Sequence, residues 1–137
     1  MQTSSSQFLR NVLRFDALTC FVSGAASLAF GRMLEAPLGL PASLLQGSGL
    51  VLLFVAAFIL FAARNTPALR WPVWAVVISN VVWALDSVLL LLSDYAEPTR
   101  LGTAYVIAQA VFVVVLAELE YTGLRKITAV PAVALQE

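Results

Sequence analysis

Residues 71–92 read WPVWAVVISNVVWALDSVLLLL, an apolar stretch in which Asp86 is the one ionisable side chain. A helix crosses a bilayer with about 20 mostly apolar residues, so this stretch predicts a transmembrane segment. The span that contains the quoted stretch covers residues 71–93 and is the third of four, because further apolar stretches lie at residues 13–31, 44–63 and 101–123. The sequence therefore predicts an all-α, polytopic membrane protein with four transmembrane helices in an up-down-up-down bundle.

The composition favours a membrane location. Hydrophobic residues make up 61% of the 137 residues and charged residues 12%, whereas soluble domains have about 45–50% apolar and about 25% charged residues. A soluble fold of this size could not bury so much apolar surface, so lipid must form part of its solvent. We expect one transmembrane domain over residues 10–126, a polar N-terminal tail over residues 1–9 and a C-terminal tail over residues 127–137.

The residue inventory argues against several function classes. Eight basic and eight acidic residues cancel, whereas a chain that binds nucleic acid needs a basic face. The chain has no histidine and a single cysteine, Cys20, so it lacks the usual haem ligand, the commonest general base and a cysteine cluster. We therefore predict no catalytic residue, no metal site and no cofactor in a non-enzymatic protein that contacts membrane lipid.

Basic residues predict the orientation, because loops rich in lysine and arginine stay in the cytoplasm. With four spans, both termini share one side with the loop between the second and third spans. That side carries Arg10, Arg14, Arg64, Arg70, Arg125 and Lys126, and the other side carries Arg32 and Arg100. We expect both termini in the cytoplasm.

Polar side chains of the stretch 71–92 share one helical face. At about 100° per residue, an arc of about 120° holds Ser79, Asn80, Trp83, Asp86 and Ser87. Asp86 either packs by hydrogen bonding to Asn80, Gln46 or Tyr105, or forms a proton or substrate site with this stripe. A further candidate for interhelical hydrogen bonding is Gln109.

Three acids are predicted near the cytoplasmic side, namely Asp16, Glu118 and Glu120. Asp16 lies near the start of its helix, where the helix dipole favours an anion, and the two glutamates lie near a helix C-terminus, where it does not. Helix-end electrostatics or ion pairing with nearby arginine or lysine explains these positions. The alternative is that these acids are the gates of a carrier.

Small residues recur at every fourth position of the first span, at Thr19, Ser23, Ser27 and Gly31. Small side chains let helix backbones approach closely in lipid. We predict that these four residues form a helix-packing seam.

The chain resembles small, uncharacterised bacterial integral membrane proteins with four helices, in the spacing of Asp16, Gly24, Pro41, Gly49, Trp83, Gly102, Gln109 and Glu118. The resemblance begins at Leu9 and covers nearly the whole remaining chain. It implies the bacterial inner membrane as location and brings no established activity. The chain is also similar to small multidrug resistance transporters in its length, its helix count and an acid in the first helix, which is Asp16. This acid differs in type from theirs, lies near a helix end and lacks their stripe of aromatic residues.

The leading functional hypothesis is an interaction, accessory or structural subunit, which packs in a homo-oligomer or against a larger membrane complex. The alternative is a small proton-coupled transporter or carrier for hydrophobic or lipid-like molecules, built on the polar stripe of the third span. A third hypothesis is an enzyme that acts on a lipid by carboxylate acid–base chemistry.

Overall fold

A computed structural model describes residues 4–128, which form four helices and no strand. The helices are α1 (Ser4–Leu38), α2 (Ala42–Asn65), α3 (Trp71–Leu92) and α4 (Arg100–Thr128). All four are long and apolar enough to cross a membrane, which confirms the expected all-α class with four candidate spans. α1 begins at Ser4, so Leu9 lies inside this helix and is fully buried. Residues 1–3 and 129–137, parts of the two expected tails, lie outside the described residues.

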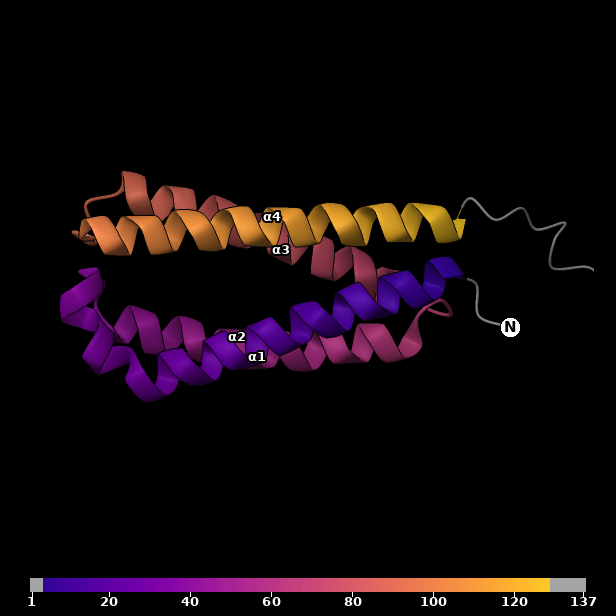
Figure 1. Cartoon of the computed structure of the whole chain (residues 1–137), viewed down its shortest axis with the longest axis horizontal. Coiled ribbons are helices and arrows are strands. Elements are labelled where there is room, and N and C mark those ends of the chain that lie inside the picture. Colours follow the sequence, from indigo (N-terminus) through magenta and orange to yellow (C-terminus); the bar gives the residue numbers. More distant parts are fainter. Residues whose placement is uncertain (1–3, 129–137) are drawn as a thin grey trace, which may run out of the picture.

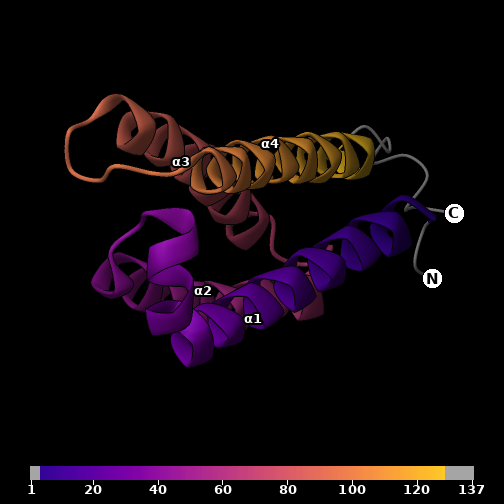
Figure 2. The same cartoon turned by 60° about the vertical axis from the view of Figure 1, so that its left-hand side comes forward.

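The helices form two hairpins, α1–α2 and α3–α4, which appear as two layers in Figure 1 and Figure 2. The hairpins meet mainly where α1 packs against α4, whereas α2 and α3 make few contacts. The beginning of α1 and the end of α4 lie at one end of the molecule, which we call the terminal end (Figure 1). The distal end is the opposite one, where residues 39–41 and 93–99 connect the helices. The packing thus leaves the side between α2 and α3 open.

α1 and α2 approach each other through glycine. A Cβ atom on Gly24 would lie 2.7 Å from the backbone oxygen of Gly49. A Cβ atom on Gly49 would lie 2.8 Å from the oxygen of Gly24 and 2.9 Å from Cβ of Ser27. Any larger side chain at either glycine would push the two backbones apart.

The predicted helix-packing seam is therefore only partly in this contact. Ser27 and Gly31 are buried, Thr19 is half-buried and Ser23 is exposed. The buried small residues follow the order Gly24, Ser27 and Gly31, because one helical face repeats at intervals of three and four residues.

At the distal end, the connection before α4 is hydrogen-bonded to the end of α1. The backbone N–H of Thr99 donates to the oxygen of Leu38 at 3.0 Å, and its hydroxyl donates to the oxygen of Pro37 at 2.7 Å. The same hydroxyl accepts the N–H of Gly102 at 3.1 Å and so caps α4. Gly39, with a φ of 67°, supplies the left-handed turn that follows α1. This network, the distal clasp, joins the hairpins.

A second link lies at the terminal end. The guanidinium of Arg10 donates two hydrogen bonds to the backbone oxygen of Thr66, one of them from Nε at 2.8 Å. Thr66 follows α2 directly and is buried. This link, the terminal clasp, joins α1 to the connection between the hairpins.

Large apolar side chains cover the outside of the molecule. Phe54 is 71% exposed and Leu92 is 79% exposed, which would be costly in water and is favourable in lipid. The interior core contains Leu9, Leu13 and Ile59, all fully buried. The surface therefore has the polarity of a protein dissolved in a bilayer.

Candidate functional site

Two carboxyl groups share one amide in the interior. The side-chain nitrogen of Asn80 on α3 donates to Oδ2 of Asp16 on α1 at 3.0 Å and to Oε2 of Glu120 on α4 at 3.1 Å. The exposed fraction is 1% for Asp16, 4% for Asn80 and 0% for Glu120. We call Asp16 and Glu120 the carboxyl pair. Three helices from both hairpins thus converge on one polar group.

The remaining carboxyl oxygens have weaker or no partners. Oδ1 of Asp16 accepts the thiol of Cys20 at 3.5 Å, one helical turn further along α1. Oε1 of Glu120 is buried and accepts no hydrogen bond from any described residue. The donors that the structure gives the carboxyl pair are therefore neutral, an amide and a thiol.

The depth of the carboxyl pair constrains its charge. Asn80 lies roughly 14 Å along α3 from Trp71, at about 1.5 Å per residue, which is near the middle of the helix. Each ionised group at such a depth loses several kcal/mol of solvation, and two neighbouring carboxylates also repel each other. A proton on one carboxyl removes one charge and supplies an O–H donor. The arrangement therefore suits a pair that holds one proton.

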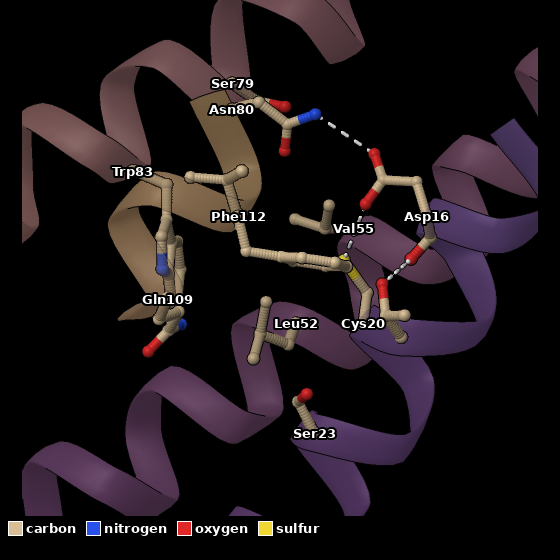
Figure 3. A pocket seen from close by; sticks show the side chains of 12 residues that line it. Asp16, Cys20, Ser23, Leu52, Val55, Ser79, Asn80, Trp83, Gln109 and Phe112 are labelled. Carbon is tan, nitrogen blue, oxygen red and sulfur yellow. Dashed lines mark hydrogen bonds between the residues drawn. The ribbon is translucent and has the colours of Figure 1, made fainter. Parts of the chain in front are cut away.

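A small cavity of about 70 Å³ borders this site. Asp16, Cys20 and Asn80 line it on one side, and Figure 3 shows Trp83 and Gln109 across from them. A water molecule needs about 10–15 Å³ of such space and several polar partners. The cavity therefore has room for water next to Asp16.

A groove of about 1240 Å³ runs along the open side between α2, α3 and α4. It shares with the small cavity the residues Leu52, Val55, Ser79, Trp83 and Gln109. The indole of Trp83 and the amide of Gln109 make no hydrogen bond with another described residue. These two side chains therefore separate the groove from the carboxyl pair and have unused hydrogen-bonding capacity.

The side chains of the polar stripe of residues 79–87 face two different surroundings, the interior and the groove. Asn80 and Ser87 are buried, Ser79 and Trp83 are half-buried, and Asp86 is exposed in the groove. The hydroxyls of Ser79 and Ser87 donate to carbonyls of their own helix at 2.9 Å and 2.8 Å. An arc of about 120° is wide enough to face two neighbours, so Asn80 reaches the carboxyl pair while Asp86 does not.

The other candidate residues do not come together at one site either. The side-chain nitrogen of Gln46 donates across to the backbone oxygen of Leu28 on α1 at 3.5 Å, whereas Tyr105 is exposed in the groove. Asp86 forms no hydrogen bond with any described residue, including the three partners considered for it. Of the three acids assigned to the cytoplasmic side, Asp16 and Glu120 meet in the interior while Glu118 is exposed.

The convergence of Asp16, Asn80 and Glu120 was not anticipated from the sequence. Helical periodicity places Glu120 on the same face of α4 as Gln109. No local pattern indicates that this face of α4 meets Asp16, since the two residues are far apart in the chain.

Among residues 4–128, no group of three histidine, cysteine or acidic side chains is placed to hold a metal ion. Comparison of the chain with protein families, curated proteins and solved structures finds no match.

Proposed function

We propose that this chain is a proton-linked carrier for hydrophobic or lipid-like molecules in the bacterial inner membrane. The observation that carries the proposal is the amide of Asn80, shared by Asp16 and Glu120 beside a cavity that adjoins the groove. The proton is held by the carboxyl pair and the carried molecule occupies the groove.

Because of where the carboxyl pair lies, its protonation state affects the distance between the two hairpins. Asp16 belongs to α1 and Glu120 to α4, the two helices through which the hairpins meet. Loss of the shared proton leaves two negative charges on opposite sides of this contact, and their repulsion favours separation. The groove lies between the same hairpins, so occupation of the groove and protonation of the pair are coupled.

The size of the cavity fits a carrier better than an enzyme that acts on a lipid. The 70 Å³ beside Asp16 has room for a few water molecules, each of which needs about 10–15 Å³ of such space. A space of this size favours water over a lipid headgroup beside the carboxyl pair.

Proton release on ligand binding tests the proposal. The purified protein in weakly buffered nanodiscs is challenged with hydrophobic cations and single-chain lipids while a pH-sensitive dye reports protons. We expect release by the wild type and none by the double variant Asp16→Asn, Glu120→Gln, because neither of the two amides can titrate. Glu118→Gln is the matched control, since Glu118 is exposed on the same helix, and it should release protons like the wild type. A wild type that releases no proton at any physiological pH would contradict the proposal.

An interaction subunit is the second candidate, favoured by the few contacts between α2 and α3. In that case a helix of a partner, or of a second copy in a homo-oligomer, fills the groove. Chemical crosslinking in native membranes distinguishes the candidates. Crosslinks from Val51 or Ile78, which line the groove, to another chain support the subunit, and crosslinks to lipid support the carrier.

The proposed orientation has both termini in the cytoplasm. Six basic residues on the terminal side against two on the other support it. A reporter active only in the cytoplasm should work when fused to the C-terminus, and one active only outside should work when inserted near Glu97. A silent cytoplasmic reporter at the C-terminus, with the fusion protein present in the membrane, would reverse the orientation.

A further inference from the structure

The groove has a single charged residue among the described residues that line it. Its walls are mostly apolar, with Val51 on α2 and Ile78, Val82 and Leu89 on α3. The polar lining consists of uncharged side chains apart from Asp86, and no described arginine or lysine contributes to it. The groove therefore combines an apolar path with one acid.

Among the described residues, Asp86 has no partner that would account for its position. It lies roughly 22 Å along α3 from Trp71 and roughly 9 Å before Leu92, at about 1.5 Å per residue. This depth is inside the span, where an acid costs up to about 3 kcal/mol on insertion scales. The side chain is exposed in the groove and forms no hydrogen bond with any described residue. A positive charge in the groove would offset this cost directly.

The dimensions of the groove favour an elongated ligand. Its volume of about 1240 Å³ exceeds the roughly 300–1,000 Å³ of common small-molecule pockets. Asp86 and Tyr95 lie toward the distal end, whereas Leu52 and Val55 lie along the apolar wall shared with the small cavity. A molecule with its head at Asp86 can place its tail along this wall.

We propose that the groove binds a single-chain amphiphile with one positive charge, such as a long-chain amine or quaternary ammonium ion, with its head at Asp86. This inference rests on the proposed carrier function and names its ligand class. Anionic amphiphiles are disfavoured by repulsion from Asp86, and uncharged ones lack the ion pair. The positive charge also weakens proton retention by the carboxyl pair, which lies behind the shared wall of Trp83 and Gln109.

Quenching of tryptophan fluorescence in nanodiscs of zwitterionic lipid tests the inference. The probes share one alkyl tail brominated near its end and carry a trimethylammonium, hydroxyl or sulfate head. Their concentration in the bilayer is measured, so that affinity refers to the lipid-dissolved probe. All proteins in this test carry Trp71→Phe and Trp74→Phe, because these two tryptophans are exposed on the outer surface. The remaining Trp83 lines the groove and should be quenched when the tail occupies it.

We expect the wild type to bind the cationic probe about tenfold more tightly than the uncharged one, as one close charge pair provides. Asp86→Asn should lose this preference and keep the affinity for the uncharged probe. Asp94→Asn is the matched control, because Asp94 is also exposed and does not line the groove, and it should behave like the wild type. An unchanged preference in Asp86→Asn, or no quenching by any probe, would overturn the inference.

The same variants separate this inference from the proposed function. The double variant Asp16→Asn, Glu120→Gln should keep the preference for the cationic probe while it loses proton release. A wild type that prefers the cation through Asp86 but releases no proton would retain the binding site and refute proton coupling. Proton release on binding of the uncharged probe, with no preference for the cation, would refute the inference alone.

Discussion

Replacement of Asn80 by leucine is expected to destabilise the folded protein by about 2–4 kcal/mol. Each buried acceptor left without its donor costs about 1–3 kcal/mol, and more when charged. Asp16 and Glu120 lose the same donor in this variant. The effect should therefore exceed the average of about 0.6 kcal/mol for polar contacts in membrane bundles. The measurement is the free energy of unfolding, from titration of the protein in mixed micelles with a denaturing detergent.

Gln109→Leu is the control for Asn80→Leu. Gln109 also lines the small cavity and carries an amide, but it makes no hydrogen bond with another described residue, so its loss should cost about 0.5 kcal/mol or less. Glu120→Gln in the Asn80→Leu background removes one acid and supplies an amide, and it should restore part of the lost stability. Equal stability of Asn80→Leu and Gln109→Leu would contradict the role given to Asn80.

Gly102→Ala is expected to be at least as damaging, with a loss of about 3–5 kcal/mol. A Cβ atom at Gly102 would lie 1.9 Å from the backbone oxygen of Leu38 and 2.8 Å from its carbonyl carbon. Both atoms are backbone, so the clash is relieved only if the end of α1 and the start of α4 separate. That movement breaks the hydrogen bonds from Thr99 to Leu38 and Pro37, each worth about 1 kcal/mol, in addition to about 1–3 kcal/mol for the overpacking itself.

Gly47→Ala is the matched control for Gly102→Ala, because a Cβ atom at Gly47 has no neighbour within 4 Å. In a helix interior this change should be neutral or stabilise by about 0.5–1 kcal/mol. Both variants are measured in the same detergent titration. If Gly102→Ala unfolds at the same detergent fraction as Gly47→Ala, the close packing of the distal clasp is refuted.

The helices follow from the sequence because each span carries its own signal. The apolar stretch 71–92 is long enough to cross a bilayer, and the helix α3 covers these residues. The start of α1 was less evident, because Ser4 to Gln7 are polar and only the burial of Leu9 shows that the first turns support a packed helix. Composition identifies spans well and helix ends less well.

The candidate site is harder to predict because its residues come from three helices. The stripe on α3 contains both Asn80 and Asp86, and composition draws attention to the acid. Which of them faces the interior depends on where α1 and α4 lie, and this is a tertiary property. In the structure the amide is inside and pairs with Asp16 and Glu120, while the acid faces the groove.

The two clasps determine how the groove can be reached. The distal clasp around Thr99 fastens the two hairpins at one end of the molecule, and the terminal clasp, Arg10 to Thr66, ties α1 to the connection between the hairpins at the other end. The unfastened stretch is the long flank between α2 and α3, which borders the hydrocarbon of the bilayer. For the carrier proposed above, ligands should consequently enter from the side, after first dissolving in the membrane, and their partitioning into lipid becomes the first step of recognition.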